Sequence, residues 1–123
     1  LVEQPRDPST VLLGVADADL YVPDETFVLG ISNRPARAAV IGLARLRQEF
    51  WGLPADEGLF RTRAVKLALH QLGHALGLRH CASWRCVMGP TPGLLGLDGA
   101  DAAYCRACRA VLATPGEAHR WRR

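Results

Sequence analysis

The strongest constraint on this chain is the position of its thiol and imidazole side chains. All four cysteines and three of the four histidines lie between residues 70 and 108 of a chain of 123 residues. Sulfur and imidazole nitrogen are ligands that zinc prefers, although clustered cysteines can also form disulfides in an oxidising compartment. Because the cysteines lie beside the histidines, we expect reduced, metal-bound thiolates and a cytoplasmic protein.

The three clustered histidines have the spacing of a metal site on a helix. His70 and His74 lie four residues apart in a segment whose apolar residues recur with helical period from Phe60 onward, so both rings leave the same helical face. Gly77 is expected to end this helix, which lets the chain turn back so that His80 supplies a third ligand. An isolated HxxxH pair more often forms ordinary hydrogen bonds, but the third histidine favours a zinc site with one coordination position open to water.

The cysteines form a CxxxxC pair and a CxxC pair, a close relative of structural zinc spacings. Four thiolates would enclose a second zinc ion and leave no position open for chemistry. Such a site would join the end of the histidine-bearing helix to a C-terminal helix and contribute much of the folding free energy of a small domain. Disulfides and buried free thiols are the alternatives. The four predicted ligands are Cys81, Cys86, Cys105 and Cys108.

The first half of the chain has the pattern of strands. Short apolar or alternating runs predict strands at residues 11–15, 26–31 and 38–46, in one mixed or antiparallel sheet, with helix as the alternative for the last run. The histidine-bearing helix is expected at residues 60–76.

The segment at residues 89–99 has the composition of a loop because it is rich in glycine and proline. Asp98 or Asp101 is expected to cap a last helix at residues 102–112, and the tail beyond residue 115 is expected to be frayed. Together these elements predict an α+β fold.

Composition limits the classes of partner. A hydrophobic content of 49% is typical of one compact domain, which we assign to residues 1–123. No apolar run approaches the ~20 residues of a membrane-spanning helix, and the first ten residues lack the pattern of a signal peptide. The net charge of +3 is weak support for nucleic-acid binding, since arginines beside the cysteines more simply neutralise a cluster of thiolates. We therefore expect neither a membrane nor a nucleic-acid partner.

The run HQLGHALGLRHCASWRCVM, followed by a spacer and CRAC, resembles the archaemetzincin family of zinc metallopeptidases, whose pattern is HExxHxxGxxHCxxxxCxM, a spacer and CxxC. The likeness includes the histidines, Gly77, the cysteines and Met88, and the upstream segments GVADADLYVPDETFVLG and AAVIGLARL also resemble the family. It implies a compact metzincin-like domain in which a twisted mixed sheet packs on an active-site helix and a C-terminal helix. It also implies an extended cleft for a peptide or protein substrate between the sheet's edge strand and the zinc, with Met88 forming a Met-turn beneath the metal.

The resemblance also concerns the N-terminal part of the fold. The family usually carries a further strand and helix before the segment that matches residue 11, so we expect this chain to lack them. A missing strand would leave an exposed sheet edge, which invites pairing with another chain. We expect a monomer, with dimerisation through that edge as the alternative.

The resemblance breaks at Gln71, where the family pattern has the glutamate of HExxH. In zinc peptidases that glutamate is the general base, a role that speeds the reaction by roughly 10² to 10⁴. An amide cannot accept the proton, although it is nearly isosteric and can still hydrogen-bond water. We therefore expect a zinc metallopeptidase scaffold with peptide-bond hydrolysis impaired or abolished, or else a non-catalytic module that binds peptide or protein. Three carboxylates are substitutes by residue type alone: Glu57, Asp98 and Asp101.

Overall fold

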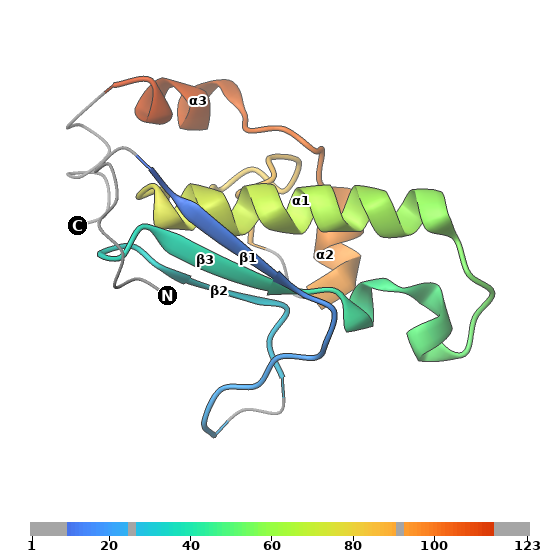
Figure 1. The fold of residues 1–123 in the computed structure, drawn as a ribbon. Helices are drawn as coiled ribbons and strands as arrows, with labels where there is room; N and C mark the ends of the chain where they lie inside the picture. Colours follow the sequence, from blue (N-terminus) through green and yellow to red (C-terminus); the bar gives the residue numbers. More distant parts are fainter. Residues whose placement is uncertain (1–9, 25–26, 91–92, 115–123) are drawn as a thin grey trace.

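The fold is a small α+β arrangement, seen in the computed structural model, which describes residues 10–24, 27–90 and 93–114 (Figure 1). The elements in chain order are β1 (Leu12–Ala16), β2 (Gly30–Asn33), β3 (Ala38–Gly42), the 3-10 helices η1 (Ala44–Leu46) and η2 (Gln48–Trp51), α1 (Glu57–Ala75), α2 (Gly93–Gly99) and α3 (Arg106–Leu112). The α+β class expected from the sequence is confirmed.

The sheet is mixed, with β3 between two edge strands. β3 pairs parallel with β1, where Leu12 faces Ala38, and antiparallel with β2, where Gly30 faces Ile41. α1 lies across one face of this sheet and contacts β2 and β3 (Figure 1). The helix that carries the predicted metal ligands is therefore fixed against the strand at the edge of the sheet.

The second strand lies further along the chain than its prediction at residues 26–31. β2 begins at Gly30, and residues 25–26 lie outside the described part of the chain. Its ladder with β3 starts at the pair Gly30 and Ile41, one residue before β3 ends at Gly42. The last backbone hydrogen bond at this end of the ladder is the one that Gly42 donates to the carbonyl of Leu29. Residues before Leu29 have no β3 residue opposite them, because β3 has ended.

The prediction of a strand at residues 38–46 is correct in its first part and wrong in its second. β3 ends at Gly42, and η1 follows from Ala44 to Leu46. The turn directs the side chain of Leu46 inward, where it is fully buried in the same cluster as Leu67. Burial of this leucine outweighs the tendency of the run to continue as a strand.

The boundaries of α1 follow from local chemistry at both ends. The helix begins three residues before the expected Phe60 because the Asp56 carboxylate accepts a hydrogen bond of 3.0 Å from the backbone N–H of Leu59. At the other end Gly77 has φ 108°, and its N–H donates to the carbonyl of His74. The N–H of Leu78 donates to the carbonyl of Gly73 at 2.8 Å, which completes a Schellman motif. The expected termination at Gly77 is confirmed.

The prediction of a loop at residues 89–99 is wrong over its second part, which forms α2. Leu97 is buried in the cluster between the sheet and α1, and this tertiary contact outweighs the low helix propensity of the glycines. Neither predicted aspartate caps the last helix: α3 has Cys105 at its N-cap, with no side-chain cap. Asp98 pairs instead with Arg63. The predicted frayed tail beyond residue 115 lies outside the described residues.

Two hydrophobic clusters share α1. One lies between α1 and the sheet and includes Ile41 and Leu67, while the other contains Leu78 and Met88 and has Leu69 of α1 packed against it. α3 lies across α1 from the sheet (Figure 1) and contributes Cys108 to the second cluster. None of the helices in the described ranges is long and apolar enough to cross a membrane.

Candidate metal centres

The three predicted histidines converge at the C-terminal end of α1. Each offers a ring nitrogen, and these three atoms lie within 4.8 Å of one another. His70 is buried, His74 is half-buried and His80 is exposed. The ring of His80 reaches the other two from the turn after α1, with ring centroids 5.3 Å from His70 and 4.8 Å from His74. The structure thus brings together the whole set predicted from spacing.

Two backbone carbonyls orient the first two rings. The Nδ1 atom of His70 lies 2.7 Å from the carbonyl oxygen of Val87, and that of His74 lies 2.9 Å from the carbonyl oxygen of Leu78. Carbonyl oxygens only accept hydrogen bonds, so each Nδ1 carries the proton and donates. Burial lowers the pKa of His70 to about 4, and burial also lowers the pKa of His74, so both rings are neutral near pH 7.

The donor set fits a tetrahedral cation. In a neutral imidazole with Nδ1 protonated, Nε2 carries a free lone pair. The two Nε2 atoms of His70 and His74 nevertheless lie only 3.2 Å apart. Nitrogen ligands about 2.0–2.1 Å from a tetrahedral zinc lie about 3.3 Å from each other, so a shared cation accounts for this approach. Hydrogen bonding from the second ring nitrogen to a carbonyl is also the usual support of a metal-binding histidine.

The four predicted cysteines form a second group of possible ligands, between α1 and α3. Their sulfur atoms lie within 4.8 Å of one another, and none forms a disulfide. The Sγ atoms of Cys81 and Cys105 are 3.7 Å apart, and those of Cys86 and Cys108 are 3.8 Å apart. Thiolates about 2.3 Å from a tetrahedral zinc lie about 3.8 Å apart, whereas disulfide sulfurs are about 2.05 Å apart. Sulfur spacing therefore favours metal binding over the disulfide alternative.

Hydrogen bonds to sulfur favour negative charge in this group. The backbone N–H groups of Met88 and Cys105 donate to the Sγ atom of Cys86 at 3.4 and 3.3 Å. A hydrogen bond from the backbone N–H of Cys108 lowers the pKa of the Cys105 thiol to about 7. Burial raises the pKa of Cys108 above its ordinary range, so the deprotonated form of this thiol needs a neighbouring cation.

Three consecutive residues connect the two groups. Cys86 belongs to the cysteine group, the carbonyl of Val87 holds the ring of His70, and Met88 packs beneath α1. Met88 is fully buried, and a methyl group on Gly73 would overlap its sulfur atom. The short segment from 86 to 88 therefore sets both the sulfur geometry and the orientation of an imidazole.

Gln71 shares a cavity with all three histidines. The cavity has a volume of about 370 Å³ and is also lined by Gly30 of β2. A Cβ atom on Gly30 would lie 2.8 to 3.0 Å from the side chain of Gln71, so a larger residue at position 30 would require that side chain to shift. Among the described residues, this cavity is lined by the edge strand β2 on one side and by the histidines on the other.

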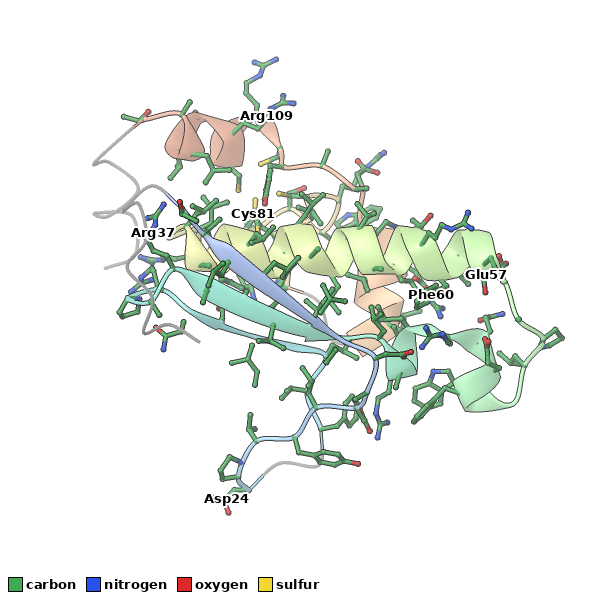
Figure 2. The ribbon with its side chains drawn as sticks, in the orientation of Figure 1. Asp24, Arg37, Glu57, Phe60, Cys81 and Arg109 are labelled. Carbon is green, nitrogen blue, oxygen red and sulfur yellow. The ribbon has the colours of Figure 1, made fainter. Side chains whose placement is uncertain are left out.

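None of the three candidate carboxylates lines this cavity. Both oxygens of Asp98 accept hydrogen bonds from Arg63, at 2.9 and 2.7 Å. Asp101 lies 3.7 Å from the guanidinium of Arg85. Glu57 begins α1 at the end far from Cys81 (Figure 2), about 20 Å along the helix from His70 at 1.5 Å per residue. Asp98 and Asp101 are thus paired with arginines, and none of the three carboxylates lies at the histidine cavity.

Comparison with known proteins identifies the family. Residues 8–114 match the model of peptidase family M54. A curated relative, archaemetzincin of Methanocaldococcus jannaschii, is 41% identical over 106 residues, which cover 86% of this chain and 59% of that protein. This chain belongs to the archaemetzincin family. Archaemetzincin of Pyrococcus abyssi is 40% identical over 78% of this chain and 51% of its own length.

Solved structures agree with this assignment. The crystal structure of a zinc-dependent peptidase from Methanocorpusculum labreanum has a TM-score of 0.79 and 35% identity, over 83% of this chain and 53% of that one. Archaemetzincin from Methanopyrus kandleri has a TM-score of 0.76 and 36% identity, over 91% and 59%. The metzincin-like fold expected from the resemblance is confirmed, and zinc is the metal that family membership supports. The chain spans between half and three fifths of the length of these relatives.

Sequence reasoning missed the residues that support the archaemetzincin-like centre. The carbonyls of Val87 and Leu78 carry no side-chain signal, because any residue offers a carbonyl. Gly30 had a detectable signal as a glycine inside an apolar run, which often marks a close approach of another group. Tyr104, whose hydroxyl donates to the Leu69 carbonyl at 2.7 Å, was also not predicted.

Proposed function

We propose that this chain is a zinc metallopeptidase scaffold in which Gln71 impairs or abolishes peptide-bond hydrolysis. The observation that carries the proposal is the cavity that Gln71 shares with three convergent histidines beside an edge strand. An archaemetzincin with a carboxylate at this position would have a proton acceptor there. This chain has an amide there, and no carboxylate in its described part lines the cavity.

In this proposal the histidines and the cysteines each hold one zinc ion. His70, His74 and His80 form the open centre, and the four cysteines form the closed, structural one. Zinc bound at the histidines supplies a Lewis acid that polarises a water molecule and the scissile carbonyl. The chain itself orients the rings through two carbonyl acceptors and places the buried Met88 beneath α1, which supports its assignment as the family's Met-turn.

The substrate in this proposal is an extended peptide lying along β2. β2 is an edge strand, and its outer side has no partner strand within residues 10–24, 27–90 and 93–114. An extended peptide can add to such an edge through main-chain hydrogen bonds. Since Gly30 of β2 lines the cavity, a peptide held there would present its backbone to the histidines and to Gln71.

Gln71 can position a water molecule but cannot accept a proton from it. Its amide can donate and accept hydrogen bonds, so it can hold a water molecule or a peptide carbonyl, but it cannot take up a proton near neutral pH. Loss of general-base catalysis costs roughly 10²- to 10⁴-fold in rate. Metal affinity is expected to survive, because three histidine nitrogens supply the ligands and a neutral amide is not among the usual zinc ligands.

The substitution Gln71→Glu tests this account directly. The zinc-loaded variant is expected to hydrolyse quenched-fluorescence peptides roughly 10²- to 10⁴-fold faster than the unchanged chain. Gln71→Ala is the matched control and should gain nothing, while zinc content and circular dichroism should stay equal in all three proteins. Adding His74→Ala to Gln71→Glu should remove the gained activity. Equal, chelator-sensitive hydrolysis by the unchanged chain and Gln71→Glu would show that residue 71 has no such role.

A second candidate is a non-catalytic module that binds peptide or protein in the same cavity. The neutral amide of Gln71 favours it, because an amide can bind a peptide group in both hydrogen-bonding directions. If metal-loaded Gln71→Glu binds peptides and still fails to cleave them, this second function is the correct one.

We further propose a monomeric, single-domain protein of a reducing compartment such as the cytoplasm, with no nucleic-acid partner. The free thiols support the compartment, since oxidation would remove the proposed metal ligands. Size-exclusion chromatography with light scattering tests the monomer against dimerisation through the edge of β1.

A further inference from the structure

The cysteine group and the histidine group are joined at two points of the chain. Cys81 directly follows His80, the exposed member of the histidine group. Cys86 directly precedes Val87, whose carbonyl oxygen lies 2.7 Å from the Nδ1 atom of His70. A displacement of either cysteine therefore also displaces a histidine or the carbonyl that orients one.

Hydrogen bonds hold the segment between these two points tightly. The N–H of Cys81 donates to the carbonyl of Met88 at 2.7 Å, and the N–H of Val87 donates to the carbonyl of Ala103 at 3.0 Å. The N–H of Met88 donates to the Sγ atom of Cys86 at 3.4 Å. Val87 and Met88 are fully buried. A packed segment of this kind transmits a shift to its neighbours, because close-packed interiors have little room to absorb it.

One pair of cysteines is open to attack by an oxidant. Cys81 and Cys105 are half-buried, whereas Cys86 and Cys108 are buried. The Sγ atoms of Cys81 and Cys105 are 3.7 Å apart, so a disulfide between them requires an approach of about 1.7 Å. Accessible thiolates that lie beside a second thiol are the ones that oxidants convert to disulfides.

We propose that Cys81 and Cys105 form an oxidation site, and that their disulfide acts as a redox switch that weakens metal binding at the histidines. The inference rests on the proposed function, because it takes both groups as metal sites. The oxidant is a peroxide. One thiolate attacks a peroxide oxygen, the O–O bond breaks, and the leaving hydroxide takes up a proton to become water. The second thiolate attacks the resulting sulfenic sulfur, the S–O bond breaks, and a second water leaves. The two thiols thereby lose two electrons, which the peroxide gains.

The disulfide changes both groups but keeps the cross-link. With two thiolates left, the cysteine group can no longer enclose a tetrahedral ion and gives up its metal. The new bond still joins the turn after α1 to the start of α3, so the oxidised chain is expected to keep its helices. The N–H of Arg109 donates to the carbonyl of Cys105 at 2.9 Å, which holds Cys105 on α3. The approach is therefore expected to come from Cys81, which moves His80 and the hydrogen bond to Met88 with it.

Zinc affinity at the histidines in the reduced and oxidised chain tests the switch. The zinc-loaded chain is treated with one equivalent of hydrogen peroxide, released zinc is measured with a colorimetric indicator, and the disulfide is located by peptide mapping. One ion should be released, and the disulfide should join Cys81 to Cys105. The affinity of the histidines, measured by chelator competition, should fall roughly 10- to 100-fold, as on loss of an outer support of a metal ligand. His74→Ala identifies which of the two affinities of the reduced chain belongs to the histidines.

Two reagents exclude damage to Met88, the chain's single methionine, as the cause. Diamide, an azo oxidant that converts thiols to disulfides and spares methionine, should lower the affinity as much as peroxide does. Dithiothreitol with added zinc should restore both ions, because it reduces disulfides but not methionine sulfoxide.

Cys105→His is the matched variant. It keeps four possible ligands, three cysteines and one histidine, which is a common structural zinc set, but it cannot form the disulfide. One equivalent of oxidant should leave the affinity of its histidine centre equal to that of its own reduced form. If Cys105→His fails to fold by circular dichroism, the comparison of peroxide, diamide and dithiothreitol on the unchanged chain decides the question.

The outcomes separate the switch from the proposed function. If the disulfide between Cys81 and Cys105 does not form, or forms without a change in affinity at the histidines, the switch is wrong and the zinc scaffold stands. An equal loss of affinity in folded Cys105→His also overturns the switch alone. If the reduced chain binds no metal at the histidines, both proposals fail.

Discussion

The cysteine group and the histidine group lie side by side, yet they differ in how much of a metal ion's coordination shell each would complete. Four sulfurs at tetrahedral spacing leave nothing open, and two of the four cysteines are buried. Three nitrogens leave one position free, and they line a cavity of about 370 Å³. A closed shell can only hold the chain together, whereas an open shell can also bind a ligand. Gln71 lies beside the histidines, so we expect a substitution there to leave the proposed folding role of the cysteine group intact.

Removing a buried cysteine should have the largest effect. Cys108→Ser is expected to abolish the cooperative unfolding transition, because structural zinc contributes on the order of 10 kcal/mol to folding of small domains. The transition is measured by far-ultraviolet circular dichroism, together with zinc content. Ala110→Ser, at an exposed position of the same helix, is the matched control and should unfold like the unchanged chain. A Cys108→Ser protein with normal stability would remove the distinction between the two groups.

Removing one histidine should cost a metal ion and little stability. His74→Ala is expected to lower zinc from two ions to one per chain by elemental analysis. It loses the hydrogen bond to the Leu78 carbonyl, worth about 1 kcal/mol, so the melting temperature should fall by roughly 5 °C. A collapse as large as that of Cys108→Ser would show that the open centre is also structural.

Graded chelation should separate the two ions. The ion at the histidines is expected to leave at a chelator concentration roughly tenfold lower, since its shell is open and one ligand, His80, is exposed. Zinc release is followed with a colorimetric indicator while circular dichroism reports the fold. The first ion should leave without a change in secondary structure. Simultaneous release of both ions would contradict the comparison.

The smallest effect is expected at Tyr104, which joins α1 to the cysteine group. Tyr104→Phe removes the hydrogen bond from its hydroxyl to the Leu69 carbonyl. The cost should be about 1 kcal/mol in urea unfolding, because a carbonyl inside a helix keeps its own backbone partner. Tyr21→Phe, at a side chain that is 65% exposed, is the control and should cost less. A loss of several kcal/mol at Tyr104 would mean that the cysteines contribute less of the local stability than proposed.

The sequence predicted the parts of the molecule that depend on short-range spacing. His70 and His74 are one helical turn apart in any α-helix, and Gly77 ends the helix by its own conformational preference. Both features therefore followed from local pattern alone. The same holds within each cysteine pair, whose short separation keeps its two members close together. The two pairs, 19 positions apart, meet only in the folded chain.

The parts that the sequence did not predict depend on distant contacts. α2 was predicted as loop because its glycines oppose a helix, but Leu97 reaches a cluster that includes Ile41 and Leu67. Asp98 was expected to cap a helix, yet Arg63 lies 35 positions earlier in the chain and binds both its oxygens. Such partners are visible only after the chain has folded.

The close fit between Gly30 and Gln71 has a genetic consequence. The edge strand passes close to the side chain of residue 71 at Gly30, and glutamine and glutamate have nearly the same shape. Every glutamine codon becomes a glutamate codon by exchange of its first base. As long as Gly30 stays a glycine, a single nucleotide change can therefore return a carboxylate to the cavity without rebuilding either group of ligands.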